Sequence, residues 1–161
     1  MRYQKQIGGK MTLLAVIRLR SAAKKSTQVN YALKIMGLTR VNHCVIVKLD
    51  DVMKGQLDKV KDYVTYGEID DATLKAMVKK RGRLEGHKRL TPEFFKEKKV
   101  TLEKVVEMYK EPKKVYELGI KKVFRLSPAS KGLKSIKATF RQKGDLGPRG
   151  KEINTLLNKM I

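Results

Sequence analysis

The stretch TLLAVIRLR, residues 12–20, decides the fold of this chain of 161 residues. Its centre is apolar and β-branched, and its last four residues, 17–20, alternate between aliphatic and basic side chains. Such alternation is typical of a β-strand, because successive side chains point to opposite faces of the sheet. The stretch therefore predicts a strand whose far end reaches solvent.

The residues after this strand, up to position 70, alternate between helical and strand patterns. Apolar side chains at helical spacing predict two helices, one at 26–37 and the other within 50–63. Runs of β-branched and aromatic residues predict the second and third strands at 43–49 and 63–69. An order of strand, helix, strand, helix, strand lays both helices on one face of a small sheet.

Beyond residue 70 the pattern is mainly helical and then loop-like. We predict helices at 70–82, from Pro92 onward and at 101–109, and a short strand at 121–126. Prolines and glycines make residues 127–151 mostly loop. A last helix has apolar residues at i, i+3, i+4 and i+7, and we expect it to dock on the body through Ile153, Leu156, Leu157 and Met160.

Positive charge is the strongest signal in the composition. The chain has 38 Lys and Arg against 16 Asp and Glu, a formal charge of +22. A domain this basic repels itself unless a polyanion neutralises it, and the usual polyanion is nucleic acid. Residues 79–89 carry six Lys and Arg against one Glu, and residues 130–151 carry seven against one Asp. Both segments are rich in glycine, which allows close approach to a phosphate backbone.

The mode of binding follows from motifs that the sequence lacks. It has no zinc-ligand spacing, no basic region followed by heptads, and no aromatic strand motif of the RNA-recognition type. Aromatic residues are 6% of the chain and Trp is absent, so a platform for stacking bases is not indicated. Large basic loops without such motifs favour recognition of a folded RNA through shape, phosphates and 2′-hydroxyls.

Other classes of protein fit the sequence poorly. The longest apolar run, LLAVI at 13–17, is far below the ~20 residues of a membrane span. We see no signal peptide, and a single cysteine allows no internal disulfide. These features favour a reducing, cytoplasmic location, with no membrane partner and no small-molecule substrate.

The adjacent pair His43 and Cys44 resembles the start of a catalytic dyad or a metal site. Neighbours in a strand point to opposite faces, so the two side chains cannot meet there. Cys44, beside valine and isoleucine, is expected to be a small buried apolar residue. His43 follows a turn, where it donates either to an RNA phosphate or to a backbone carbonyl.

Carboxylates are the remaining candidates for catalysis. The pairs Asp50–Asp51 and Asp70–Asp71 each precede a predicted helix, where aspartate caps the helix and complements its dipole. Capping explains these pairs better than acid–base chemistry does. We therefore predict no catalytic residues and no metal site.

Several long strings resemble one protein family. LAVIRLRS (14–21), MGLTRVNHCVIV (36–47) and KVKDYVTYGEID (59–70) are similar to the large-subunit ribosomal protein family L-thirty, and more closely to its archaeal branch, whose eukaryotic counterpart is called L-seven. The segment FRLSPASKGLKSIKATFRQKGDLGPRG (124–150) resembles the extension of archaeal and eukaryotic members. Tyr66 stands where we expected Trp.

The resemblance implies an α+β fold with a ferredoxin-like β-α-β-α-β core and a helical, basic-loop C-terminal extension. It also implies a structural constituent of the large ribosomal subunit, without enzymatic activity or cofactor, whose partners are large-subunit rRNA and neighbouring ribosomal proteins. The alternative function is that of an RNA-binding chaperone outside the ribosome, or of an enzyme that acts on RNA. The RNA contacts that we predict are Arg18, Arg20, Arg40, Asn42, His43, Lys79, Lys80, Arg81, Arg83, His87, Lys88, Arg89, Lys131, Lys134, Lys137, Arg141 and Arg149.

Three parts are expected along the chain. Residues 11–70 form the RNA-binding core, and residues 71–161 form the extension. Residues 1–10 precede the family pattern, and GGKM (8–11) is what an in-frame, purine-rich ribosome-binding site followed by a start codon would encode. Residues 1–10 are therefore either a wrongly assigned start or a basic arm that lies on RNA.

Overall fold

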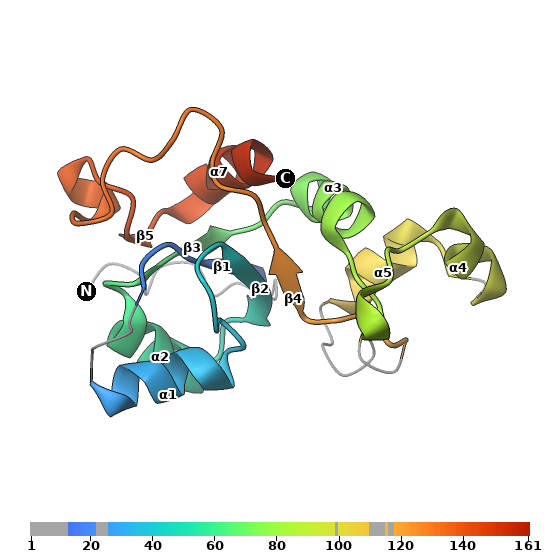
Figure 1. Ribbon diagram of the computed structural model, residues 1–161, viewed down its shortest axis with the longest axis horizontal. Coiled ribbons are helices and arrows are strands. Elements are labelled where there is room, and N and C mark those ends of the chain that lie inside the picture. The colour runs from blue at the N-terminus through green and yellow to red at the C-terminus, as the bar shows by residue number, and fades with distance from the viewer. Residues whose placement is uncertain (1–12, 22–25, 99, 110–114, 116–117) are drawn as a thin grey trace.

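The protein is described by a computed structural model that covers residues 13–21, 26–98, 100–109, 115 and 118–161. The expectation for residues 1–10 lies outside the described residues. Figure 1 shows a central sheet with helices on both of its faces and a helical segment beside it. The fold is α+β, as predicted.

The sheet has the strand order β4-β2-β1-β3-β5. Its central strands are β1 (Leu13–Arg18), β2 (His43–Lys48) and β3 (Val64–Glu68). Both neighbours of β1 run antiparallel to it. These are the three predicted strands, and the helices between them, α1 (Thr27–Ile35) and α2 (Asp51–Val60), are also confirmed.

Every residue of β1 is buried, because helices cover both faces of the strand. Leu14 and Val16 face the cluster formed with α1 and α2, and Ala15 and Ile17 face the opposite cluster. The prediction that the far end of the strand reaches solvent is wrong for Arg18, of which only 8% is exposed. The turn between α1 and β2 covers that end of the strand.

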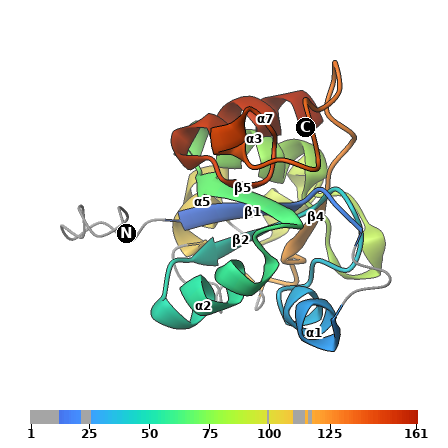
Figure 2. The ribbon, with the colours of Figure 1, turned by 90° about the vertical axis from the view of Figure 1, so that its left-hand side faces the viewer.

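The second face of the sheet is covered by α3 (Asp71–Arg81) and α7 (Ile153–Met160), as Figure 2 shows. All four predicted docking residues of α7 are buried, so the prediction is confirmed. Asn154 ties α7 to the end of β3, since its Nδ2 donates to the carbonyl of Glu68 and its Oδ1 accepts from the N–H of Asp70. Both bonds measure 3.0 Å.

In the part of the chain that the structure describes, three helical segments come next after α3, and one of them, α5, packs against α3. They are η1 (Glu85–His87), α4 (Pro92–Glu97) and α5 (Leu102–Met108). The predicted apolar face of α5 is buried at Val105 and Val106.

Two short edge strands complete the sheet. The predicted strand near 121–126 is β4 (Val123–Arg125), which pairs with β2. The sequence did not predict β5 (Gly147–Pro148), which pairs in parallel with β3 and lies between η2 (Phe140–Gln142) and η3 (Gly150–Glu152). Two residues, one of them a proline, carry no alternating pattern that could reveal a strand.

The predicted Asp caps are only partly right. Asp50 and Asp70 occupy the N-cap positions of α2 and α3, but neither side chain makes a capping hydrogen bond. Asp51 instead pairs with Lys54 of its own helix at 2.7 Å, at the exposed surface. That pair lowers the pKa of Asp51 through the hydrogen bond and charge of Lys54. These carboxylates thus remain at the dipole-favoured helix starts without closing a cap.

Candidate nucleic-acid interface

Arg18 builds the turn that follows α1. Its Nη1 donates to the carbonyl oxygens of Leu38 at 2.7 Å and Thr39 at 2.8 Å, and its Nε donates to the carbonyl of Arg20 at 3.1 Å. Burial lowers the pKa of Arg18, but arginine stays charged because its ordinary pKa is above ~12. The guanidinium therefore donates to backbone carbonyls and stabilises the turn, and it does not face solvent.

Asn42 gives the turn its shape. Its φ of 63° lies in the left-handed region, which asparagine tolerates better than most residues. Its N–H donates to the carbonyl of Arg18 at 2.7 Å, and its own carbonyl accepts from the N–H of Leu126 at 3.0 Å. The turn leaves Arg40 exposed. Arg40 is therefore presented outward, whereas Arg18 is held within the turn.

His43 lies at the start of β2 and is buried. Its Nδ1 is 3.4 Å from Oγ1 of Thr39, and the backbone of Gly37 also hydrogen-bonds the ring. Burial lowers the pKa of His43, and the charges of Arg125, Arg40 and Arg18 lower it further. The imidazole is therefore neutral near pH 7 and engages the backbone, one of the two roles left open by the sequence.

Cys44 points to the other face of the strand. It is fully buried, and burial raises the pKa of its thiol. Cys44 belongs to the apolar cluster that contains Phe124, whereas the neighbouring Val45 belongs to the opposite cluster. The interpretation that His43 and Cys44 form no dyad is confirmed.

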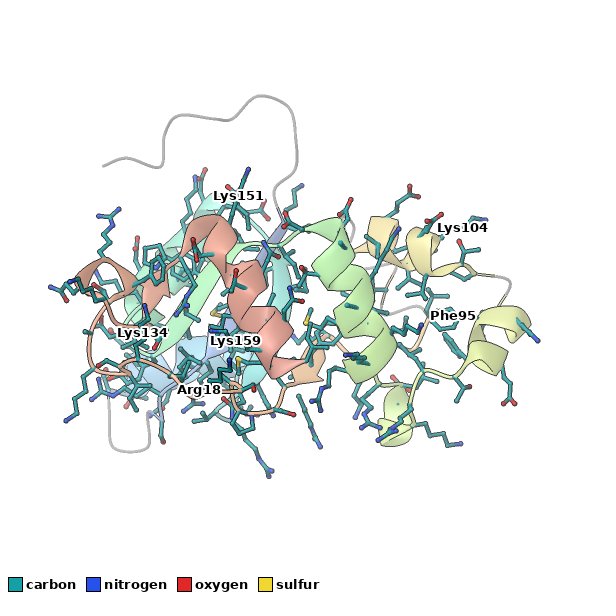
Figure 3. The ribbon with its side chains drawn as sticks, turned by 90° about the horizontal axis from the view of Figure 1, so that it is seen from above. Arg18, Phe95, Lys104, Lys134, Lys151 and Lys159 are labelled. Carbon is teal, nitrogen blue, oxygen red and sulfur yellow. The ribbon has the colours of Figure 1, made fainter. Side chains whose placement is uncertain are left out.

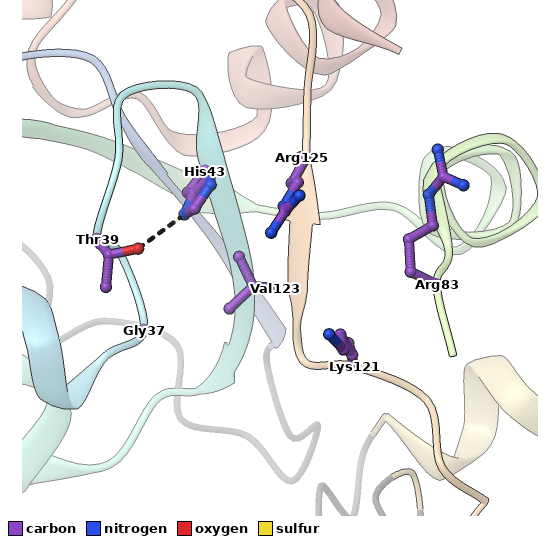
Figure 4. A pocket seen from close by; sticks show the side chains of 7 residues that line it. All are labelled: Gly37, Thr39, His43, Arg83, Lys121, Val123 and Arg125. Atoms are coloured by element: carbon purple, nitrogen blue, oxygen red, sulfur yellow. Dashed lines mark hydrogen bonds between the residues drawn. The ribbon is translucent and has the colours of Figure 1, made fainter. Parts of the chain in front are cut away.

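A hollow of about 310 Å³ opens between the turn, β2 and β4. Figure 4 shows three basic side chains around it, Arg83, Lys121 and Arg125, with His43 and Thr39 on the opposite side. Backbone pairing brings Arg83 there, since the N–H of Lys121 donates to its carbonyl at 2.8 Å. The hollow thus joins the predicted segment 79–89 to the strand β4.

The other cations of segment 79–89 divide into two groups. One group, Lys79, Lys80, Lys88 and Arg89, is exposed. Of these, Lys79 and Lys80 lie at the C-terminal end of α3, where cations complement the helix dipole. Arg81 is half-buried: its Nε donates to the carbonyl of Ile161 at 3.1 Å and its Nη2 donates to Oγ of Ser127. The side chain of His87 lies outside the part that the structure describes.

The basic loop of residues 130–149 is organised by a buried ion pair. Nη2 of Arg149 lies 2.5 Å from Oδ1 of Asp145, and the two side chains are 8% and 6% exposed. Oδ2 of Asp145 also accepts from the backbone N–H groups of Lys134 and Ser135. The Arg149 guanidinium carbon lies 4.6 Å from the ring centroid of Phe140. Arg149 therefore holds the loop from within.

Cations on the outside of this loop are solvent-exposed. Lys131, Lys134, Lys137 and Arg141 all lie there, together with Lys143, which the sequence did not single out. Figure 3 places Lys134 at the opposite end of the molecule from Phe95 of α4. The loop leads into β5, while the hollow adjoins β4, so the two basic surfaces lie at opposite edges of the sheet.

Arg20 has an intermediate position. It is half-buried, and its guanidinium carbon lies 5.9 Å from the ring centroid of Tyr63, within reach of a cation–π interaction. Its backbone N–H donates to the carbonyl of Tyr63 at 3.1 Å. Arg20 therefore lies against the start of β3.

Two basic residues of the hollow, Lys121 and Arg125, were missed from the sequence. They belong to KKVFRL, which the apolar residues marked as a strand. β4 is a strand of three residues that pairs on one edge only, and basic residues precede it and end it. Charges of this kind are typical of an edge strand, and they are the signal that could have revealed a basic sheet edge.

The described ranges hold neither a metal-binding cluster nor a membrane-spanning helix. No group of three His, Cys, Asp or Glu side chains is placed to hold a metal ion there. In the same residues, no helix has the length and apolar character needed to cross a membrane.

Comparison with known proteins agrees with this architecture. The family model described as Ribosomal protein L30p/L7e matches residues 14–64. The Large ribosomal subunit protein uL30 of Methanosphaera stadtmanae is 40% identical over 152 residues, which cover 92% of this chain and 100% of the relative. Its counterpart in Methanococcus maripaludis (strain C5) is 44% identical over 151 residues, with 91% and 98% covered. That of Nanoarchaeum equitans is 40% identical over 155 residues, with 94% and 100% covered. The chain therefore belongs to the uL30 family of large ribosomal subunit proteins.

Proposed function

We propose that this protein is a structural, non-enzymatic constituent of the large ribosomal subunit that binds and stabilises folded rRNA. The observation that carries the proposal is membership of the uL30 family over nearly the whole chain. A net charge of +22, with exposed cations at both edges of one rigid sheet, supports the RNA-binding part. The protein then works in the cytoplasm, next to other ribosomal proteins.

The rRNA contacts in this proposal are a subset of the exposed or partly exposed cations. They are Arg20, Arg40, Lys79, Lys80, Arg83, Lys88, Arg89, Lys131, Lys134, Lys137 and Arg141, with Lys121, Arg125 and Lys143 added. Arg18, Asn42, Arg81 and Arg149 support these surfaces through hydrogen bonds within the protein. His87 stays a predicted contact from the sequence alone.

The domain organisation is also a proposal. Residues 11–70 supply the three central strands and the two helices on one face. Residues 71–161 supply the helices of the second face and both edge strands, so core and extension share one sheet. We infer that the extension positions RNA-binding cations rather than acting as a separate module.

Salt dependence of binding tests the RNA-binding part. The logarithm of the affinity falls linearly with the logarithm of the salt concentration. Removing one cation that touches a phosphate should make this slope shallower by roughly 0.7–0.9, because fewer counterions are released. We expect the double variant Lys137→Ala, Arg141→Ala to bind purified large-subunit rRNA more weakly and with a shallower slope. The matched control is Lys98→Ala, Lys104→Ala, which removes two exposed cations outside the proposed contacts. Equal slopes for both double variants would overturn the assignment of the loop.

A further inference from the structure

The hollow beside β4 has two neighbouring hollows. A second hollow, of about 370 Å³, shares Thr39 with it and extends past Lys34 and Asn30 of α1. A third, of about 350 Å³, shares Lys121 and Val123 and extends toward Gly119. The middle hollow, which Figure 4 shows, therefore shares lining residues with each of the other two.

The middle hollow combines an apolar wall with a cationic rim. Its wall is formed by the side chain of Val123, the backbone of Gly37 and the His43 ring. Its rim carries Arg83 and Arg125 with Lys121. At about 310 Å³ it lies at the small end of the ~300–1,000 Å³ range of ligand pockets, which suits one planar group rather than a helix.

Gly37 allows the turn to lie close to β4. Its φ is +80°, a conformation that side chains rarely adopt, and an added Cβ would lie 3.0 Å from Cγ2 of Val123 and 3.2 Å from Cε of Lys122. The turn therefore lies directly against β4 only because residue 37 has no side chain.

Three arginines place positive charge around His43, in addition to Arg83 and Lys121 on the rim of the hollow. Arg125, Arg40 and Arg18 all lower the pKa of its ring, so their charges act together at this point. Among the residues that line the three hollows, Glu85 is the one acid, and it lines only the third hollow. An entering phosphate would reduce the repulsion that these cations exert on a protonated His43.

We propose that the middle hollow binds a single rRNA nucleotide turned out of its stack. The base lies against Val123 and His43, its phosphates contact Arg83, Lys121 and Arg125, and the strand continues toward the two neighbouring hollows. Splayed bases of this kind are the usual targets of proteins that read single-stranded RNA elements. The inference rests on the proposed rRNA-binding function, and it adds an insertion site to what would otherwise be contacts with the backbone alone.

Two substitutions separate base insertion from phosphate contact. Val123→Phe fills the hollow without changing charge, and we expect it to weaken binding to large-subunit rRNA about tenfold with an unchanged salt slope, since the stacking of one base is removed. Arg125→Gln should also weaken binding, but with a slope shallower by about one contact. Lys104→Gln is the charge-matched control and should leave both quantities unchanged. Wild-type affinity in a folded Val123→Phe protein would overturn base insertion.

A spectroscopic experiment on the unmodified protein covers the case in which Val123→Phe fails to fold. Adenosine 5′-monophosphate should shift the methyl resonances of Val123, and ribose 5-phosphate should not, because only the base produces a ring current there. Both should raise the pKa of His43. Base insertion would be rejected if the nucleotide did not shift the Val123 methyl resonances, or if the nucleotide and ribose 5-phosphate shifted them equally. If the wild-type protein fails to bind large-subunit rRNA at all, the proposed function fails as well, whereas wild-type binding with no effect of either variant removes only this inference.

Discussion

Asp145 and Arg149 form an ion pair inside the basic loop, with 2.5 Å between Oδ1 and Nη2. Both side chains are almost fully buried, and the carboxylate accepts two further bonds from backbone N–H groups. One acid thus organises a loop that presents cations to solvent. The pair connects loop folding to the proposed RNA surface.

Removing one partner of this pair should destabilise the protein strongly. Arg149→Ala leaves a buried, uncompensated carboxylate, so we expect the free energy of unfolding to fall by about 3–5 kcal/mol. Urea denaturation followed by circular dichroism measures the change. The control is Lys54→Ala, whose exposed pair with Asp51 should contribute little to stability because solvent screens it. A similar loss of stability in both variants would show that the Asp145–Arg149 pair stabilises the protein no more than an exposed pair does.

Acidification should release the same loop. Burial tends to raise the pKa of Asp145, but the hydrogen bond and charge of Arg149 and the N–H groups of Ser135 and Lys134 outweigh it, so the pKa is lowered. A carboxylate with a lowered pKa stabilises the fold above its unfolded value, near ~3.9, and this contribution disappears as pH falls through the folded value. We expect Asp145→Asn to be less stable than wild type at pH 7. The difference between them should shrink below pH 4, and a difference independent of pH would contradict this assignment.

Arg18 and Arg40 should respond to substitution in opposite ways. Arg18→Lys removes the fork that reaches two carbonyls, so we expect a loss of ~1–3 kcal/mol in the free energy of unfolding. Arg40→Ala, at an exposed position, should change stability by less than ~0.5 kcal/mol and weaken binding to rRNA. Thermal denaturation and filter binding on both variants provide the comparison. If Arg40→Ala also unfolds the protein, the division between supporting and contacting arginines is wrong.

Cys44 should be inert in the native protein. It is fully buried with a raised pKa, and the thiolate is the reactive form. Iodoacetamide should therefore label Cys44 only after unfolding, as mass spectrometry can show. Because the folded pKa lies above the unfolded one, stability should fall as pH rises past ~8.5, where the unfolded thiol ionises. Rapid labelling under native conditions would refute the buried position.

The sequence predicted the regular helices and strands of this fold well. Periodicity located β1, β2, β3 and most helices, because each buries a regular face against the sheet. It could not reveal β5, since Gly147 and Pro148 join the sheet through backbone pairing with β3 and not through a side-chain pattern.

The candidate site was less accessible to sequence reasoning. Arg18 and Arg40 look equivalent in the sequence, but carbonyls of residues 38 and 39 capture only Arg18. Asp145 offered a clearer clue, as the single acid in a strongly basic segment, four residues before Arg149. A lone acid in such a segment is a reason to expect an internal ion pair.

Sedimentation of ribosomes tests the central claim most directly. A cell extract is separated on a sucrose gradient at moderate salt, and this protein is identified in each fraction by mass spectrometry. We expect it in the large-subunit and intact-ribosome fractions, in amounts equal to those of other large-subunit proteins. Its presence only in the free protein fraction at the top of the gradient would contradict the proposed role.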